Sequence, residues 1–538
     1  MHSAVLLKAE VKALQAANEQ KKRKERKRKR RIMQGGSLSV REGEDILQSA
    51  EVNAQVRTEV ASKSSRQTEV ALYGISGRSI NAQAHDNPVL CGVTHRALNS
   101  TGNPILARPT RGSNQAPSRS VHPLLTIIDP AIQTLMIRSL IDIYRNEGKL
   151  PDCRMSFCKG LTQGGSNADI VLADSYLKNI TEGVDWVTGY EAVVSDAEDE
   201  PLNWSVEGRG GLNSWKNLHY IPTDDFDPYG FGPFTRSISR TVEYAYDDFC
   251  IAEMAKGMDK IADAEKYLER SGYWKNMYNP EQTSHIDGND TNFVGFLQPR
   301  YLNGTWGYQD PILCSPLYNF TSCYLSPGGH ETYEGSSWLY TFFVPQDMAS
   351  LILTLGGPET FIERLTYLHS YPDLLYLGDE QAFLPVFQYH YGGRPALSAV
   401  QAHTYIPSQF NNTFNGIPGN EDSGAMGSFS SLAMMGLWPI SGQDVYLITP
   451  PFFKEVNITN GQTGKTSTVR NINFDAEYEN VFIQSATLDG APYHKNWISH
   501  SFYSQGGVLE LTLGRNESAW GTGQHDLPPS SSTNGGTS

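Results

Sequence analysis

The sequence predicts a mainly α-helical protein, in which an incomplete (α/α)6 toroid is followed by a β-rich C-terminal unit. From about residue 122 to residue 436, apolar residues recur every three or four positions in successive segments, with no alternating strands between them. Many paired helices without strands favour a toroid over an α/β fold. After residue 443, the stretches DVYLITPP, VFIQSATLDG and GVLELTLG are rich in β-branched residues and are separated by glycine turns, which predicts strands.

The 538-residue chain is 39% hydrophobic and has a mean hydropathy of −0.41, which suits a globular protein of about two to four domains. Changes in composition along the chain predict the boundaries. We expect a basic helical tail (1–33), a low-order linker (34–118), a partial (α/α)-barrel domain (119–440), a β-rich C-terminal unit (441–520) and a flexible tail (521–538).

The two ends of the chain differ strongly in charge. Residues 1–31 contain twelve basic and three acidic residues and end in KKRKERKRKRR, whereas the whole chain has a net charge of −14. A basic block of this kind is typical of a solvated tail, a nuclear-localisation patch or a nucleic-acid-binding arm. The remainder is acidic, so we expect its main surface to bind neither nucleic acid nor an anionic membrane.

Signals for cellular location point in different directions. The sequence has no apolar run long enough to span a membrane and no signal peptide at its start, because the basic block follows the short apolar run instead of preceding it. Nine N-x-[ST] sequons give weak support for an extracellular body. They are at Asn99, Asn179, Asn203, Asn289, Asn303, Asn319, Asn411, Asn457 and Asn516. Cys314 and Cys323 are the first candidates for a disulfide and Cys153 and Cys158 the second.

Helical periodicity and end signals predict the helices of the 119–440 domain, with irregular aromatic loops between about 274 and 333. The first helix has Gly148 as its stop and an expected apolar face of Ile132, Leu135, Met136, Leu140 and Ile143. The expected helices are at about 129–147, 166–180, 184–198, 236–256, 259–271, 335–355, 358–369, 379–391, 395–406 and 423–436.

An acidic turn precedes the last of these helices, in the stretch FNGIPGNEDSGAMGSFSSLAMMGLWP. Asn420, Glu421 and Asp422 lie between Gly419 and Gly424, which allow positive φ angles and close approach of the backbone to a ligand. A helix N-terminus favours ionised carboxylates, as a general base or a metal ligand requires. A simple helix cap is the alternative interpretation.

A second acidic candidate lies in HETYEGSSWLYTFFVPQD, where Glu334 precedes an aromatic helix. Desolvation beside aromatic rings raises the pKa of a carboxylic acid, so Glu334 is a candidate general acid. Trp338, in the helix that follows, is a candidate substrate-binding residue. Glu331 competes with Glu334 for this role, and a surface residue in a first helical turn is the alternative for Glu334.

A third candidate is LGDEQAFLPVFQYHYGGRP, in which Asp379 and Glu380 open another helix. Adjacent carboxylates can bind Ca²⁺ or accept hydrogen bonds from sugar hydroxyls, and the aromatic residues that follow could pack against a sugar ring. His390 fits a packed aromatic cluster better than a ligand role. Loops at one end of a toroid converge on one cleft, so we expect the three acidic segments to form one site.

These segments resemble glycoside hydrolase family 92, the calcium-dependent exo-acting α-mannosidases, and are closest to its secreted fungal members. The matching runs are HPLLTIIDP, SISRTVEYAYDDFCIAEMAKGM, YEGSSWLYTFFVPQD, LGDEQAFLPVFQYHYGGRPALSA, NGIPGNEDSGAM, ITPPFFKEV and NWISHSF. They occur in the family's order and extend from about residue 122 to residue 529.

The resemblance implies an inverting hydrolase that releases mannose from mannose-containing glycans of the N-glycan type. Glu334 matches the general acid and Asp422 the general base, supported by Glu421 or Asn420. Glu380, with Asp379, matches the sugar-binding and metal-linked region, and Asp422 and Glu380 are the expected ligands of the Ca²⁺ ion. Secretion is also implied by the resemblance.

The sequence departs from the family pattern in several places. Asp379 and Gln381 replace Asn and Pro of the GNEP motif, and Asn420-Glu421 replaces the commoner Asn-Asp or Asp-Glu. The N-terminal β-sandwich and a WDT-like motif are not visible upstream of His122, so the sequence predicts an N-terminally truncated member. Residues 1–33 resemble the tail of fungal pogo-like transposases. The alternative hypothesis is a catalytically impaired homologue that at most binds carbohydrate. The third hypothesis is a nuclear protein that binds nucleic acid.

Overall fold

The computed structural model describes residues 119–151, 165–223, 236–318, 330–419 and 424–534, together with a few short strands. These strands are β1 (Arg96–Leu98), β2 (Pro104–Leu106), β3 (Gly112–Ser113) and β4 (Cys153–Arg154), paired β1 with β2 and β3 with β4. The chain divides into units Met1–Ala84 and His85–Ser538, and the description that follows concerns the second. The predicted basic tail and residues Asn420, Glu421 and Asp422 lie outside the described residues.

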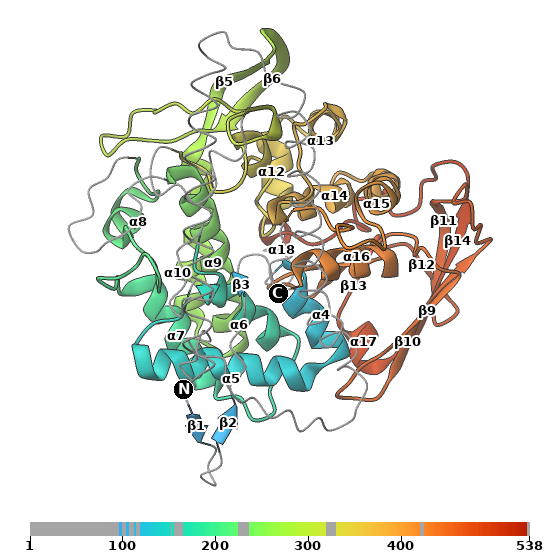
Figure 1. Ribbon diagram of the computed structural model, residues 1–538, viewed down its shortest axis with the longest axis horizontal. Helices are drawn as coiled ribbons and strands as arrows, with labels where there is room; N and C mark the ends of the chain where they lie inside the picture. Colours follow the sequence, from blue (N-terminus) through green and yellow to red (C-terminus); the bar gives the residue numbers. More distant parts are fainter. Residues whose placement is uncertain are drawn as a thin grey trace, which may run out of the picture. The chain divides into compact units, whose positions relative to one another are not determined.

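The first half of the described chain is helical, as predicted, and its helices are coloured blue to green in Figure 1. It contains α4 (Val121–Ile128), α5 (Pro130–Glu147), α6 (Asn167–Leu177), α7 (Trp186–Glu198), α8 (Leu212–Leu218), α9 (Ser237–Gly257) and α10 (Ile261–Arg270). Five expected helices therefore form close to their predicted ends, while α4 and α8 were not predicted. Helix α9 is the centre of this region, because it packs against α6, α7, α10 and α11 (Ser337–Tyr340) and is buried over most of its length.

Helix α5 begins and ends at the predicted residues, but its buried face differs from the prediction. The Asp129 carboxylate accepts a hydrogen bond from the Ile132 amide, and Gly148 ends the helix with a φ of 82°. Ile132 and Leu135 are exposed, whereas Gln133 is fully buried. Gln133 is buried because its amide contacts His122 Nδ1 at 3.0 Å and donates to Ser175 Oγ at 2.8 Å. The buried face of α5 therefore differs from the face predicted from hydrophobicity alone, because it includes a polar residue with buried hydrogen-bond partners.

The region predicted as irregular aromatic loops contains a β-hairpin. Strands β5 (Tyr278–Ile286) and β6 (Asn289–Leu297) pair antiparallel and follow the short 3₁₀ helix η1 (Tyr273–Met277). The turn between them is Asp287-Gly288, and both residues have positive φ angles, of 52° and 79°. An Asp-Gly pair is the expected sequence for such a two-residue turn, so the prediction missed an available signal.

Two of the long helices predicted in the second half are broken in the structure. The expected helix at 335–355 is split into α11 and α12 (Met348–Thr354) around Pro345, and the expected helix at 379–391 consists of η4 (Glu380–Ala382), α14 (Phe383–Phe387) and η5 (Gln388–His390). The remaining elements are η2 (Pro316–Tyr318), α13 (Pro358–Ser370), α15 (Pro395–Gln409) and α16 (Ala425–Met435). The first pieces of these two broken helices, α11 and η4, are short and contact each other.

The C-terminal region is β-rich, as predicted, and its strands lie together in the orange and red part of Figure 1. One sheet has three strands in the order β13-β8-β7 and the other has five in the order β12-β11-β14-β10-β9. Strands β10 and β14 are parallel, and the other pairs are antiparallel. The elements are β7 (Leu437–Ile440), β8 (Val445–Ile448), β9 (Glu455–Thr459), β10 (Thr466–Ile472), β11 (Phe482–Leu488), β12 (Ala491–Tyr493), β13 (Trp497–Ile498), α17 (Ser501–Gln505) and β14 (Gly507–Gly514).

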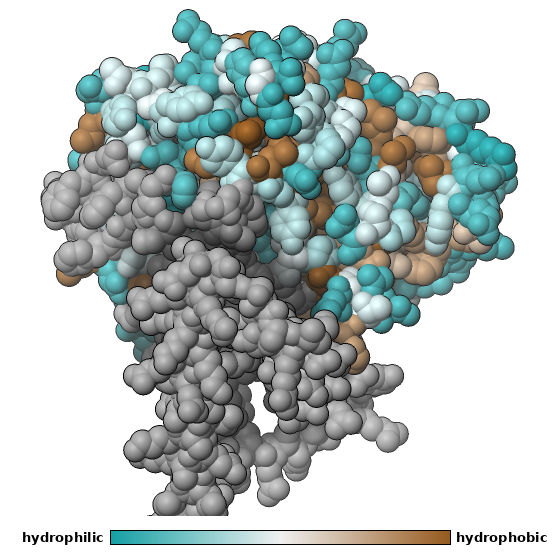
Figure 2. Space-filling model, turned by 45° about the horizontal axis from the view of Figure 1, so that its top comes forward, coloured by the Kyte–Doolittle hydropathy of each residue, from teal (hydrophilic) through white to brown (hydrophobic). Residues whose placement is uncertain are grey.

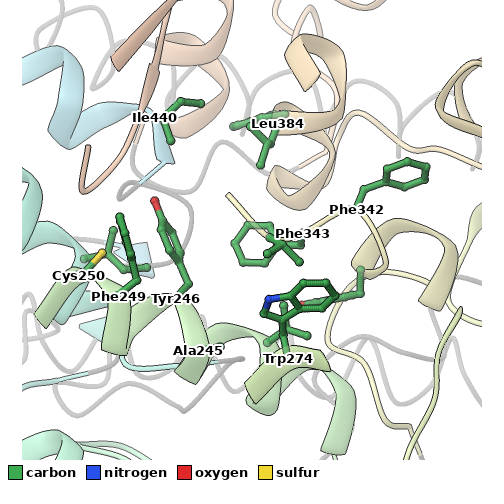
Figure 3. Close-up of a cluster of buried hydrophobic side chains, with 14 of the residues drawn as sticks. Ala245, Tyr246, Phe249, Cys250, Trp274, Phe342, Phe343, Leu384 and Ile440 are labelled. Atoms are coloured by element: carbon green, nitrogen blue, oxygen red, sulfur yellow. The ribbon is translucent and has the colours of Figure 1, made fainter. Parts of the chain in front are cut away.

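Two apolar cores hold these regions together. Figure 3 shows part of the larger one, where Tyr246 and Phe249 of α9 lie near Phe343, Leu384 of α14 and Ile440 of β7. The smaller core lies in the C-terminal region but includes Ile127 of α4. Through α4, the helical region therefore contributes to the core of the β-rich region.

A buried ionic cluster surrounds Arg209. Its guanidinium lies 2.6 Å from Asp169 Oδ2 and 2.6 Å from Asp248 Oδ1, and 3.8 Å from Asp247 Oδ2, and all four side chains are inaccessible to solvent. Burial raises the pKa of Asp169 and of Asp247, and the charge of Arg209 opposes that rise. A buried charge without its partner is costly, so Arg209 is needed wherever these three aspartates are ionised.

The C-terminal end packs onto the helical region, which differs from the flexible tail predicted for 521–538. The Ser531 amide donates to the Gln346 carbonyl at 2.9 Å, and Ser530 Oγ accepts from the Ala349 amide at 3.1 Å. Helix α18 (Ser531–Asn534) thereby covers the start of α12. Hydrogen bonding to an exposed helix N-terminus explains how a polar segment without apolar periodicity can dock.

Hydrophilic side chains cover most of the described surface that is visible in one view. Figure 2 shows hydrophobic side chains only as small patches among hydrophilic ones on the face in view. None of the described helices combines the length and apolar character needed to cross a membrane. Cys314 is disulfide-bonded; its predicted partner Cys323 lies outside the described residues, so the pairing stays a prediction.

Candidate active site

Three acidic side chains from two separate segments meet in one buried cluster. Glu334 comes from the segment before α11, and Asp379 and Glu380 come from the start of η4. One carboxylate oxygen of each lies within 4.8 Å of the others. All three residues are buried, with exposures of 8%, 4% and 5%. The structure therefore brings together two of the three acidic segments expected to form one site.

The charge of this cluster is not balanced by its own members. Burial raises the pKa of Asp379 well above its usual value, and the neighbouring charges of Glu334 and Glu380 raise it further. The charge of Arg119 acts in the opposite direction. One oxygen of Asp379, Oδ1, is buried without a hydrogen-bond partner in the described part of the chain. Three close carboxylates of this kind need either a bound proton or a bound cation.

The donor set of the cluster fits a hard divalent cation. Calcium prefers carboxylate and carbonyl oxygens, and Glu334, Asp379 and Glu380 offer only oxygen atoms. The buried Asp379 Oδ1 has no competing partner among the described residues. A cation bound here would satisfy that oxygen and offset the negative charge, so these residues fit the implied metal.

Glu334 is held in an unusual backbone conformation. Its φ is +50°, in the left-handed region that non-glycine residues seldom adopt. The preceding residue, Tyr333, is fixed on two sides: its carbonyl accepts a hydrogen bond from Tyr340 Oη at 2.9 Å, and the Arg236 guanidinium lies 4.7 Å from its ring centre. Strained non-glycine residues cluster at functional sites, where the surrounding structure holds them in place.

Glu331, the alternative to Glu334, has a structural role. Its Oε2 accepts a hydrogen bond from the Ser237 amide at 2.9 Å, and Thr223 Oγ1 donates to its other oxygen. Its backbone carbonyl accepts from the amides of Ile238 and Ser239. Glu331 thus satisfies the unpaired N–H groups at the start of α9. The structure separates the two glutamates into a helix cap and a member of the acidic cluster.

Trp338 lies in the apolar core, a position that does not fit the predicted contact with substrate. It is fully buried, and its indole N–H donates to Ser284 Oγ at 2.8 Å. The ring packs against Phe296 at 4.9 Å and Tyr367 at 5.5 Å between centroids. An indole enclosed on all sides has no free face for a sugar, so Trp338 supports the helix behind Glu334 instead.

His390 is a packed residue, as the sequence suggested. Its Nε2 lies 2.8 Å from the Ile448 carbonyl, and its Nδ1 lies 2.9 Å from the Phe387 carbonyl and 3.0 Å from Ser398 Oγ. Burial lowers its pKa to about 4, so the ring is neutral at pH 7. The histidine connects η5 to β8 and has no contact with the acidic cluster among its hydrogen bonds.

The described residues on both sides of the acidic turn make contacts with other parts of the chain, and those on the Gly419 side lie next to this cluster. On one side, Gly419 has a φ of 63°, and a Cβ built there would lie 1.9 Å from the Gly378 carbonyl oxygen, next to Asp379. On the other side, the Ala425 carbonyl accepts a hydrogen bond from Ser120 Oγ at 3.0 Å. Residues 420–423 themselves lie outside the described residues.

Arg119 was not identified from the sequence. Its guanidinium lies 3.0 Å from Glu243 Oε1 of α9 and 4.4 Å from the ring centre of Phe343. Its positive charge also lowers the pKa of Asp379, opposing the effect of burial and of the neighbouring carboxylates. An arginine beside a serine at the start of a helix carries no sequence signal for such a role.

An apolar cavity lies beside the cluster but does not include it. Its volume is about 30 Å³, and it is lined by Arg119, Tyr246, Phe343, Phe383, Leu384 and Trp438, among others. None of the three carboxylates lines this cavity, and its walls are almost entirely apolar. A sugar needs hydrogen-bond partners, so the carboxylate cluster is the better candidate for its binding site.

Comparison with known proteins connects this geometry to a family. Residues 117–515 match the glycosyl hydrolase family 92 catalytic domain. A protein of Arthroderma benhamiae described as an uncharacterized secreted glycosidase is 61% identical over 391 residues, which are 73% of this chain and 50% of that protein. The chain thus spans about half the length of the curated relative it matches.

Solved structures show the same relationship. An inverting mannosidase of family GH92 from Bacteroides thetaiotaomicron aligns with a TM-score of 0.68 and 25% identity, covering 81% of this chain and 59% of that one. A GH92 α-mannosidase from the same bacterium, in complex with mannoimidazole, aligns with a TM-score of 0.66 and 22% identity over 81% of this chain and 55% of that one. Because the domain match covers most of the described residues, the chain belongs to glycosyl hydrolase family 92.

Proposed function

We propose that this protein is a glycoside hydrolase that releases terminal mannose from α-mannosides of the N-glycan type by a calcium-dependent inverting mechanism. The observation that carries the proposal is the buried cluster of Glu334, Asp379 and Glu380, whose oxygens lie within 4.8 Å of one another. The family match and the mannosidase named in the 25% identical structure support the choice of substrate. We also propose that the paired helices form an (α/α)6-type toroid with this cluster at its mouth.

In the proposed reaction, Glu334 is the general acid that protonates the glycosidic oxygen. Its position fits this role because its side chain is nearly buried and lies on a backbone that Tyr333 and Tyr340 hold in place. Departure of the leaving group requires the proton at the moment the bond breaks, since an alkoxide is a poor leaving group. Asp379 and Glu380 then bind the sugar hydroxyls or the cation.

Asp422 is the proposed general base, supported by Glu421 or Asn420. It is three positions after Gly419 in the sequence, so it lies within about 11 Å of that residue's backbone. Gly419 contacts Gly378 beside the cluster. An inverting pair needs a separation of roughly 6.5–9.5 Å to admit a water molecule, and this chain length permits it. Asp422 would take a proton from that water as it attacks the opposite face of the sugar.

Calcium is the proposed cofactor, with Glu380 and Asp422 among its ligands and Asp379 and Glu334 close to it. Bound there, the ion would hold two ring hydroxyls of the terminal mannose and offset the charge of the carboxylates. The oxygen-only donor set and the unpartnered Asp379 Oδ1 support this choice. The chain's own residues bind the ion, orient the sugar and transfer the protons.

Passage through the secretory route is also proposed. The disulfide at Cys314 and the relative described as secreted support it, since disulfides persist in oxidising compartments. Detection of the protein in the culture medium of its host, and not in the nucleus, would be the expected result.

A direct assay tests the proposed function. The purified full chain is incubated with a panel of α-linked mannobioses in Ca²⁺ or in a chelator, and released mannose is followed by ¹H NMR. We expect β-mannose as the first product and loss of activity in the chelator. Glu334→Gln and Asp422→Asn should each lower kcat by about 10²–10⁴-fold. Undiminished activity in Glu334→Gln, or α-mannose as the first product, would contradict the proposal.

A further inference from the structure

Tyr340 lies directly behind the backbone that carries Glu334. It is the last residue of α11 and is fully buried. Its hydroxyl donates a hydrogen bond of 2.9 Å to the carbonyl of Tyr333, the residue before Glu334. Its ring also adjoins the residue after Glu334, because a Cβ built on Gly335 would lie 3.3 Å from Tyr340 Cε2. One side chain therefore contacts both neighbours of Glu334.

The segment it contacts needs such support. Glu334 has a φ of +50°, a conformation that is unfavourable for a residue with a side chain. Without an outside constraint, the Tyr333–Glu334 peptide would relax towards a more common conformation, and the carboxyl group would move with it. The hydrogen bond from Tyr340 opposes that relaxation, because rotation of the peptide would carry the Tyr333 carbonyl away from the hydroxyl.

The helix that carries Tyr340 also packs against the other half of the acidic cluster. Helix α11 contacts η4, and the side chain of Gln381, the residue after Glu380, interacts with Tyr340. Gln381 is buried and lies in η4. Tyr340 thus connects the segment of Glu334 with the segment of Asp379 and Glu380, which otherwise belong to separate parts of the chain.

We propose that Tyr340 is a positioning residue that fixes the Glu334 carboxyl group relative to Asp379 and Glu380, and that Gln381 acts through it. The inference rests on the proposed function, because it assigns Tyr340 to the delivery of a proton by Glu334. A tyrosine that only fills the core would affect stability but not the relative rates of substrates with different leaving groups.

The test is the Tyr340→Phe variant, which removes one hydroxyl and keeps the ring. An α-mannobiose needs a proton on its leaving group, whereas 2,4-dinitrophenyl α-mannoside releases a stable anion without one. We expect kcat for mannobiose to fall by about 10–100-fold, the range of a misplaced catalytic group, and kcat for the activated substrate to fall by less than about threefold. KM should stay within about twofold for both.

Tyr176→Phe is the matched control, because Tyr176 Oη makes a similar bond, of 2.8 Å, to the Gly257 carbonyl in another part of the molecule. It should leave the ratio of the two kcat values unchanged. Gln381→Ala is the second variant if Tyr340→Phe folds poorly by circular dichroism. We expect it to shift the ratio in the same direction, and the double variant to lose less than the product of the two single losses.

Calcium affinity gives a readout that does not depend on turnover. By isothermal titration calorimetry, Tyr340→Phe should bind Ca²⁺ at least about fivefold more weakly than wild type, since the spacing of the carboxylates changes. If both kcat values fall equally and calcium affinity is unchanged, Tyr340 has only a packing role and the inference is wrong. If wild-type protein binds Ca²⁺ but releases no mannose, the proposed function fails, and the affinity comparison alone decides the role of Tyr340.

Discussion

The backbone N–H of Ser237, at the start of α9, lies 2.9 Å from Oε2 of Glu331. This hydrogen bond satisfies one of the free N–H groups of the longest described helix, and it occupies a carboxylate only three residues from Glu334. The two glutamates are therefore distinguished by their partners. Glu331 caps the start of α9, and Glu334 belongs to the buried acidic cluster.

The first prediction concerns that distinction. Glu331→Ala should lower the free energy of unfolding by about 1–2 kcal/mol, because α9 loses its N-terminal acceptor, and should change kcat by less than about threefold. Urea unfolding and mannose release measure the two effects. Glu359→Ala, in the first turn of α13, is the control and should cost less than about 0.5 kcal/mol. A large loss of activity at full stability would instead assign Glu331 to the reaction.

The second prediction concerns the cation. Asp379→Asn keeps the shape of the side chain but removes a negative charge and one possible ligand oxygen, so calcium affinity should fall by about 10–100-fold. Calorimetric titration measures it. In wild type, Ca²⁺ at a hundred times its Kd should raise the free energy of unfolding by about 2.7 kcal/mol, and this gain should be small in the variant.

Asp373→Asn is the control for this experiment, since Asp373 is exposed in the same connection before η4. It should bind Ca²⁺ as wild type does. Equal affinity in wild type and Asp379→Asn would place the cation elsewhere or remove it from the mechanism.

The third prediction concerns pH. Burial lowers the pKa of His390 from 6.5 to about 4, so the folded protein holds this ring neutral while the unfolded chain becomes protonated below pH 6.5. Its contribution to stability is therefore complete above pH 6.5 and is lost as pH falls towards 4, by an amount on the order of 3 kcal/mol.

His390→Gln tests this sign. The variant should be less stable than wild type at pH 7, because the hydrogen bonds to Phe387 and Ile448 are lost or weakened, and the difference should shrink as pH falls from 6.5 to 4. Urea unfolding at several pH values measures it. His285→Gln, at an exposed position, is the control for the substitution itself. A constant difference for His390→Gln would contradict a depressed pKa.

The fourth prediction concerns the buried charges on α9. Arg209→Met should destabilise the protein by about 3–5 kcal/mol, because Asp169, Asp247 and Asp248 lose the cation they surround. Arg145→Met removes an ion pair of similar length, 2.7 Å to Asp185, whose side chains are 45% and 46% exposed. It should cost no more than about 1 kcal/mol. Similar losses of stability in the two variants would show that burial does not increase the contribution of the Arg209 cluster to stability.

Local sequence signals predicted most of the helices and the β-rich end. Asp129 and Gly148 mark the ends of α5 because a side-chain cap and a left-handed glycine act on the nearest turn. The prediction of the buried face of α5 was wrong because it left out Gln133. The side chain of Gln133 has its hydrogen-bond partners in other helices, His122 in α4 and Ser175 in α6. Polar burial of this kind depends on tertiary partners that periodicity does not report.

The candidate site, like the fold, could be predicted only in part from local sequence signals. Glu334, Asp379 and Glu380 were each identified from a glycine beside a carboxylate at a helix start, and the structure adds that they share one cluster. Trp338 was assigned to the substrate because an aromatic residue near an acid suggests a sugar platform, but its ring is enclosed by core residues. Arg119 was missed, since its effect on Asp379 arises only when the segment before α4 and the start of η4 are brought together by the fold.

The contact between Gly419 and Gly378 has a consequence for how this region can vary. Position 419 is exposed, so it would be expected to accept many residues in a deep mutational scan. Yet any side chain there would overlap the backbone of residue 378, from a loop about forty positions earlier. We therefore expect such a scan to recover almost only glycine at this solvent-facing position, and insertions between the two loops to be tolerated only where they leave this backbone contact unchanged.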